Sequence, residues 1–191
     1  SDRLMGTMET LLATEGEVSE ADRGIFRVWS TTFGDPDSTL FYESLDPRFV
    51  SNYPLTEAAK ETLAAFDPLT DTPTLNCAPK GMPVIMEQPY PMEIIEQGED
   101  ILLRLEEYDT LRTIHLGVAA AGVNQLSSRL GYSIGHWEGD TLMVETVNFN
   151  DKTWIDRRGV PHSDQLRVVE RIHRSDEDEL IVDITVEDIV A

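Results

Sequence analysis

Residues 92–116 read MEIIEQGEDILLRLEEYDTLRTIHL, and this stretch decides the fold. The runs at 92–96, 101–108 and 111–116 are rich in isoleucine and leucine, and each is about as long as a strand. Only short polar turns separate these runs, and parallel pairing requires a crossover of a dozen or more residues. The stretch therefore predicts the opening of an antiparallel meander.

The same pattern continues almost to the end of the chain. Further strand-sized apolar segments lie at 130–137, 141–149, 165–173 and 180–187. A meander of this length buries one face and tends to close on itself, because closure removes its exposed edges. We therefore predict an all-β fold whose antiparallel meander closes into a lipocalin-like barrel or a strongly curved sheet. A two-sheet sandwich is the alternative.

Alternation along each strand predicts which side chains point inward. The predicted inward faces, in chain order, are Ile101, Leu103 and Leu105; Leu130, Tyr132, Ile134 and His136; Leu166, Val168 and Ile172; and Leu180, Val182, Ile184 and Val186. The segment 141–149 stays ambiguous, because both of its faces carry apolar residues.

Two polar residues fall on these apolar faces, and they are the first candidates for a functional site. Glu170 and His136 would form an interior polar site, because a buried carboxylate requires a partner. The alternative places Glu170 near a barrel rim, paired with Arg167, Arg171 or Arg112. His136 would then sit at the rim and bond a backbone carbonyl.

The N-terminal part of the chain carries one predicted helix in a long extension. Residues 24–30 resemble a strand, and 38–53 show no clear period. Thr56 can cap a helix of about ten residues that ends at Asp67-Pro68. The proline-rich residues 68–91 still contain an apolar trio at 84–86, so we expect an ordered extended segment packed on the sheet.

These elements suggest one main domain. Residues 1–20 are predicted to be a tail or the remnant of an upstream β domain, and 21–191 a single β-barrel-like domain. Within that domain, 54–91 holds the helix and the proline-rich packing segment, and 92–188 holds the meander. The chain opens at Ser1 without an initiating methionine or an apolar leader, as a processed or truncated product would.

Composition narrows the classes of partner. The formal net charge is -21 over 191 residues, so the surface should repel nucleic acid and anionic membranes. No apolar run reaches the length of a membrane helix. Cys77 is the only cysteine, which excludes an intramolecular disulfide, and the four histidines have no metal-ligand spacing. We predict no metal and no cofactor.

The loop at 148–163 is the densest collection of chemically useful side chains. Asp151, Trp154 and His162 lie in it, at what would be the mouth of a barrel, where ligand contacts concentrate. Together with Tyr132, His136 and Glu170 they are the candidate ligand-binding residues. The alternative is an Ω-like loop whose asparagine and aspartate side chains cap its own backbone.

Several stretches together resemble a family of exported bacterial proteins. These are residues 130–142, 148–154 and 161–163, with the proline-rich 77–83 and residues 90–95. They are similar to uncharacterised "hypothetical proteins" of marine proteobacteria, acidobacteria and planctomycetes, and the resemblance covers roughly residues 54–188. It implies a periplasmic or extracellular location. It implies no activity and no catalytic residue.

Three hypotheses of function follow. The first is an exported barrel that binds a small, partly apolar ligand at the mouth beside 148–163. The second is an enzyme, a lyase, isomerase or hydrolase, in which His136, His162, Asp151 and Glu170 supply an acid–base pair. The third is a structural subunit of an envelope complex, suggested by the long N-terminal extension.

Overall fold

The computed structural model describes residues 24–30, 54–72, 75, 77–117, 126–156 and 158–191. Its strands are β1 (Val28–Trp29), β2 (Met92–Gln97), β3 (Asp100–Leu105), β4 (Thr110–Leu116), β5 (Tyr132–Glu138), β6 (Thr141–Val147), β7 (Arg167–Asp176) and β8 (Glu179–Glu187). Its helical elements are the α-helix α4 (Glu57–Ala65) and the 3-10 turns η2 (Val84–Glu87) and η3 (Glu107–Asp109). The predictions for residues 1–20 and 38–53 lie outside the described residues.

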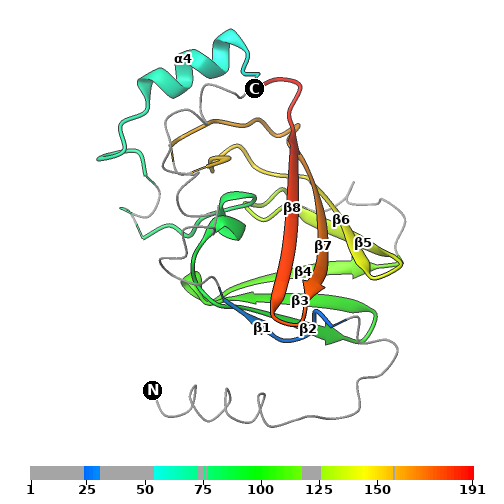
Figure 1. Cartoon of the computed structure of the whole chain (residues 1–191). Helices are drawn as coiled ribbons and strands as arrows, with labels where there is room; N and C mark the ends of the chain where they lie inside the picture. The colour runs from blue at the N-terminus through cyan, green and yellow to red at the C-terminus, as the bar shows by residue number, and fades with distance from the viewer. Residues whose placement is uncertain (1–23, 31–53, 73–74, 76, 118–125, 157) are drawn as a thin grey trace.

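The eight strands form one sheet in which spatial order follows chain order, from β1 to β8. The sheet curls into a nearly closed barrel, as Figure 1 shows, so the predicted all-β meander is confirmed. Strands β1 and β8 end the order on either side, and within the described chain neither pairs with the other. We call the gap between them the seam of the barrel.

One strand pair contradicts the expectation of antiparallel neighbours throughout. Strands β4 and β5 pair in parallel, over Ile114 to Leu116 and Ser133 to Gly135. The chain between these strands runs from residue 117 to residue 131, which is long enough to return to the starting end of β4. The remaining neighbours are all antiparallel.

The strand expected at 24–30 is shorter than predicted. Only Val28 and Trp29 pair with β2, because the preceding backbone turns inward at Ile25. Ile25 is fully buried, and its carbonyl accepts a hydrogen bond of 2.8 Å from the Trp29 indole. This segment therefore contributes to the core more than to the sheet.

Helix α4 forms as predicted. The Thr56 side chain accepts a hydrogen bond of 3.2 Å from the Ala59 backbone, and the helix ends just before Phe66. Phe66 packs edge-on against Trp154 with ring centroids 5.2 Å apart, so the helix attaches to the 148–163 loop. In the described part of the chain, no helix has the length and apolar character needed to cross a membrane.

The apolar trio of the proline-rich segment packs against the sheet, but it is not extended. Residues 84–87 form the η2 turn, with Met82, Val84 and Ile85 buried. Proline cannot donate to a strand ladder, while its fixed φ suits the start of a helical turn, and Pro83 occupies that position. The segment is anchored where the Met82 backbone donates to the Arg129 carbonyl at 2.9 Å.

The predicted inward faces of β3 and β7 are confirmed. Strand β6, which the sequence left ambiguous, turns Leu142, Val144 and Thr146 inward. The prediction for β5 is wrong: Ser133 and Gly135 point inward, and His136 is exposed. The cause is the close parallel neighbour, because a Cβ on Gly135 would lie 2.7 Å from the Ile114 side chain. The inward face of β5 therefore carries small residues, Ser133 and Gly135, rather than large apolar ones.

The contact at Gly131 generates a prediction about stability. Gly131 has φ +66°, and a Cβ there would lie 2.7 Å from both the Thr146 methyl and the Val147 carbonyl. We expect Gly131→Ala to lower the free energy of unfolding by about 1–3 kcal/mol more than Gly139→Ala in urea titrations. Gly139 is the matched control, because its φ is +61° and its Cβ would meet nothing. Equal losses in both variants would show that backbone strain alone matters.

Candidate functional site

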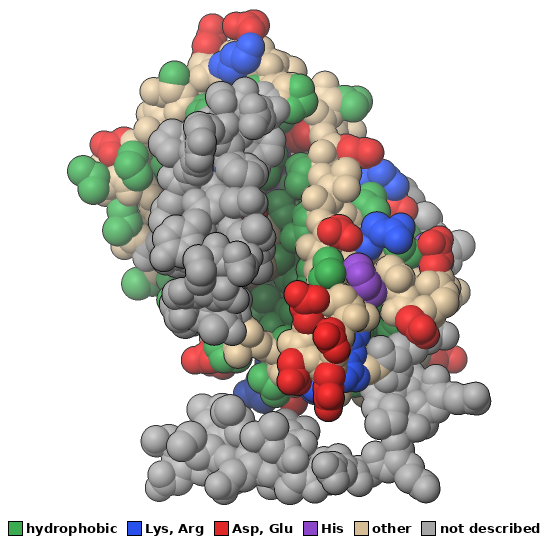
Figure 2. Space-filling model, in the orientation of Figure 1, with side chains coloured by type: hydrophobic (Ala, Val, Ile, Leu, Met, Phe, Trp, Pro, Cys, Tyr) green, Lys and Arg blue, Asp and Glu red, His purple; other side chains and the backbone are tan. Residues whose placement is uncertain are grey.

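A hollow of the molecule lies at the seam. It has a volume of about 410 Å³, and its walls come from β8 on one side and from Trp29, η2 and the residues that lead into β2 on the other. Apolar side chains dominate it: Trp29, Ile85, Met86, Tyr90, Met92, Leu105, Leu180, Ile181, Val182 and Ile184. Figure 2 shows hydrophobic side chains exposed in a hollow beside β8.

A second hollow of about 230 Å³ continues along β8 toward the end of the chain. Its walls include Pro83, which precedes η2, Glu87 of η2, Ile155 of the 148–163 loop, and Val186. Ile184 lines both hollows, so the two adjoin at this residue. We call them together the seam groove.

Among the described residues, β8 has the inward face of a barrel strand but no second neighbour that covers it. Val182, Ile184 and Val186 stand opposite Ile172, Glu170 and Val168 of β7, and directly paired residues share a face. The three β7 residues are fully buried, whereas the three β8 residues are only partly buried. The sequence therefore supplies a core-type face that the described structure leaves open.

The described charged side chains that line the groove are all acidic. Among its described lining residues are five carboxylates, at Glu87, Asp178, Glu179, Asp183 and Asp188, and no lysine or arginine. Acidic side chains also gather around the turn between β7 and β8, at the foot of β8 in Figure 2. The groove is thus apolar along its floor and acidic along its rim.

The interior of the barrel holds a buried ion pair. Arg112 of β4 and Glu170 of β7 are 2% and 0% exposed, and their side chains form a two-pronged contact. One prong joins Arg112 Nη1 to Glu170 Oε1 at 2.9 Å, and the other joins Nη2 to Oε2. We call this pair the clasp. It ties strands from opposite parts of the sheet to each other across the core.

Further contacts complete the hydrogen bonding of the arginine. Arg112 Nε donates to the Ser133 hydroxyl at 3.1 Å, and Nη2 donates to the Thr146 hydroxyl at 2.9 Å. Nη1 also lies 3.8 Å from the Met86 sulfur. Each nitrogen of the guanidinium therefore has a protein partner, and the clasp is a structural element rather than a ligand-binding group.

The structure separates the two predicted interior polar residues. Glu170 is paired with Arg112, one of its three expected partners, but it lies in the core rather than at a rim. His136 is exposed and lies 3.2 Å from Glu138, so its predicted interior position is wrong. Tyr132 also lies outside the barrel, where its ring stacks on His115 at 4.8 Å. Both predictions failed because β5 turns the opposite face from the predicted one toward the core.

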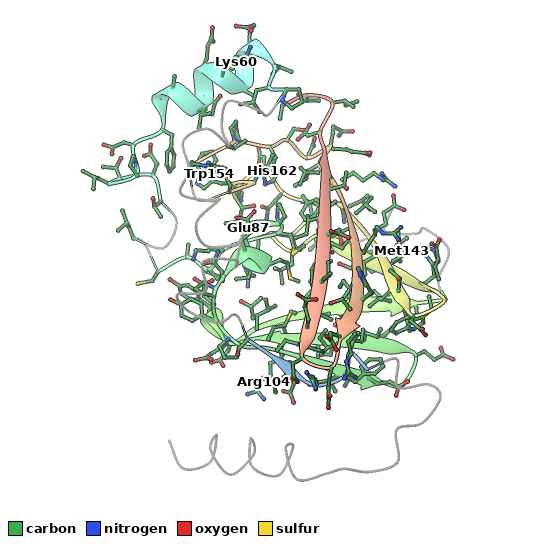
Figure 3. All side chains as sticks on the ribbon, viewed as in Figure 1. Lys60, Glu87, Arg104, Met143, Trp154 and His162 are labelled. Atoms are coloured by element: carbon green, nitrogen blue, oxygen red, sulfur yellow. The ribbon has the colours of Figure 1, made fainter. Side chains whose placement is uncertain are left out.

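The 148–163 loop lies at the α4 end of the barrel, where Figure 3 places Trp154 and His162. His162 is 7% exposed and is held by the Thr153 hydroxyl and the Ser163 carbonyl, both at 2.9 Å. Trp154 packs on Phe66, and Asp151 is exposed. Asn150 and Asp156 accept hydrogen bonds from backbone N–H groups two residues later, as expected for a self-capped loop.

The described contacts bring no two of the acid–base candidates together. The described hydrogen bonds and ion pairs join no two of His136, His162, Asp151 and Glu170. Among the described residues, no group of three or more His, Cys, Asp and Glu side chains could hold a metal ion.

The structure brings together one surface constellation that sequence reasoning missed. His115 Nδ1 lies 3.1 Å from the Asp100 carboxylate, and both residues are partly exposed on the outer face of the barrel. The two residues are register partners across β3 and β4, so their pairing depends on strand register. The seam groove was missed for a related reason: alternation shows which face is apolar, but not which strand lacks a neighbour.

The described fold and site define a class of protein: a nearly closed, mostly antiparallel eight-stranded β-barrel with a filled interior and an open apolar seam. Comparisons with protein-family models, with curated proteins and with solved structures each found no match to this chain.

The clasp generates a prediction about stability. Glu170→Leu leaves the Arg112 charge buried without a partner, so we expect a loss of about 3–5 kcal/mol in the free energy of unfolding. The double variant Arg112→Met with Glu170→Leu removes both charges and should recover most of that loss. Urea titrations of the two single variants and the double variant would measure the coupling. If the losses of the two single variants add up to the loss of the double variant, the two side chains do not interact, which would contradict the clasp.

A second prediction concerns pH. Burial raises the pKa of Asp188, but N–H and O–H donors from Ser163, Val190 and Ala191 outweigh it, so the pKa lies below its ordinary value. The ionised form is therefore favoured in the folded state, and its stabilisation is lost as pH falls below the ordinary value of about 3.9. Near neutral pH, we expect the free energy of unfolding to be larger for the wild type than for Asp188→Asn. This difference should shrink in acid, and a difference independent of pH would contradict the assignment.

Proposed function

We propose that this protein is a binding module that holds a small, partly apolar ligand in the seam groove. The observation that carries the proposal is the open apolar face of β8, bordered by a hollow of about 410 Å³. Ligand sites are concave, mostly apolar and usually about 300–1,000 Å³ in volume, with a few polar groups at their edges. The larger hollow fits that description.

The position of this site differs from that in a lipocalin-like barrel, where the ligand lies inside. Here the interior is occupied by the clasp and by buried side chains such as Leu103, Val144 and Ile172. The seam, by contrast, offers apolar surface from Trp29 and Val182 to a molecule arriving from outside. The proposal therefore moves the ligand from the mouth of the barrel to its side.

The proposed location is the periplasm or the extracellular medium, and this part rests on the resemblance of residues 54–188 to exported bacterial proteins. A binding module needs no catalytic constellation, which agrees with the scattered positions of His136, His162 and Glu170. We therefore favour binding over catalysis.

The test is a titration with Nile red, a neutral apolar dye whose fluorescence rises in apolar surroundings. Val182→Asp places a charge on the groove floor, so we expect it to weaken dye binding by about tenfold or more. Thr185→Asp is the matched control, because it adds the same charge to the exposed outer face of β8. This variant should bind the dye as wild type does.

Circular dichroism and thermal melting would confirm that both variants fold. The proposal fails if wild type does not bind the dye. It also fails if folded Val182→Asp binds the dye as tightly as Thr185→Asp, because the dye would then lie elsewhere.

A further inference from the structure

The larger hollow touches the edge of β8 as well as its inward face. Seven consecutive residues of this part of the chain, 178–184, line the hollow. Side chains alternate between the two faces of a strand, so a hollow that touches one face is lined by every second residue. The smaller hollow shows that pattern, with Ile184, Val186 and Asp188. Because the residues that line the larger hollow are consecutive, its wall includes the edge of the strand with its backbone.

That edge offers backbone hydrogen-bonding groups. In the described sheet β8 pairs with β7 alone, so alternate N–H and C=O groups of β8 point away from β7 and toward the seam. Across the seam, β1 contributes only Val28 and Trp29. Among the described residues this edge of β8 is unpaired, and an unpaired strand edge is a template for another extended segment.

The charges beside this edge favour one kind of extended segment as a partner for β8. Glu179 and Asp183 are exposed on the outer face of β8, and the described groove lining contains no lysine or arginine. Asp178 is 91% exposed, although it also contacts Arg27. Opposite charges on neighbouring strands stabilise pairing, and like charges oppose it. The outer side of the edge therefore favours basic side chains, while the inner side favours apolar ones.

We propose that the ligand of the seam groove is an extended peptide segment of a partner protein, in which lysine or arginine alternates with apolar residues. The segment adds to β8 as a further strand. Its apolar side chains pack on Val182, Ile184 and Met86, and its basic side chains lie beside Glu179 and Asp183. This inference rests on the proposed function, because it names the ligand of that same groove.

The experiment uses the full chain and fluorescein-labelled heptapeptides in which lysine alternates with valine, with binding measured by fluorescence anisotropy. Two matched peptides carry N-methyl groups, one on every lysine and the other on every valine. Alternate N–H groups of an added strand face β8, so only one of these sets donates to the protein. We expect one methylated peptide to bind at least about tenfold more weakly, and the other to bind as the parent does.

The protein variants separate seating in the groove from general charge attraction. Val182→Asp makes the groove more acidic but disrupts its apolar floor, so we expect weaker binding of the lysine–valine peptide. Attraction by charge alone would instead strengthen it. Thr185→Asp should leave the affinity unchanged or slightly higher. A glutamate–valine heptapeptide should bind at least about tenfold more weakly than the lysine–valine peptide.

The outcomes distinguish this inference from the proposed function. If Nile red binding depends on Val182 but both methylated peptides bind like the parent, strand addition is wrong and groove binding stands. Equal affinity for the glutamate–valine peptide would overturn the charge preference. If neither Nile red nor the lysine–valine peptide binds the wild-type chain, both proposals fail together.

Discussion

The architecture depends on one buried charge pair, the clasp between Arg112 and Glu170. It joins β4 to β7 across the core, and the hydroxyls of Ser133 and Thr146 fix the arginine from β5 and β6. Four consecutive strands thus contribute to one polar centre. A buried pair of this kind adds little net stability over apolar residues, but it penalises arrangements that leave one charge alone. The clasp therefore favours the arrangement in which β4 and β7 face each other across the core.

The clasp also affects where apolar surface is left exposed. Its side chains lie in the middle of the barrel, among buried residues such as Leu103, Val144 and Ile172. The open apolar surface is instead at the seam, where β8 keeps the inward-facing pattern of a core strand but has no described neighbour beyond β7. The core and the seam groove are then two parts of one apolar face.

Much of the fold was predictable from the sequence, because strand boundaries depend on local alternation and on turns that short segments encode. Alternation along residues 101–105 and 180–187 shows directly which side chains share a face, and Thr56 marks the start of the helix. The parallel β4–β5 pair was not predictable, because chain length permits a crossover without requiring it. The inward face of β5 was missed because Gly135 fits a neighbour that alternation cannot reveal. The partner of Glu170 could be narrowed to three arginines, but only the register selects Arg112.

The separation of the two clasp residues along the chain affects how the protein is made. During synthesis Arg112 leaves the ribosome well before Glu170, which lies 58 positions later. Until β7 emerges, the sheet of β2, β3 and β4 contains a core-facing positive charge whose carboxylate does not yet exist. Burying that charge alone is costly, so burial of Arg112 is favoured only once the strand that carries Glu170 is available.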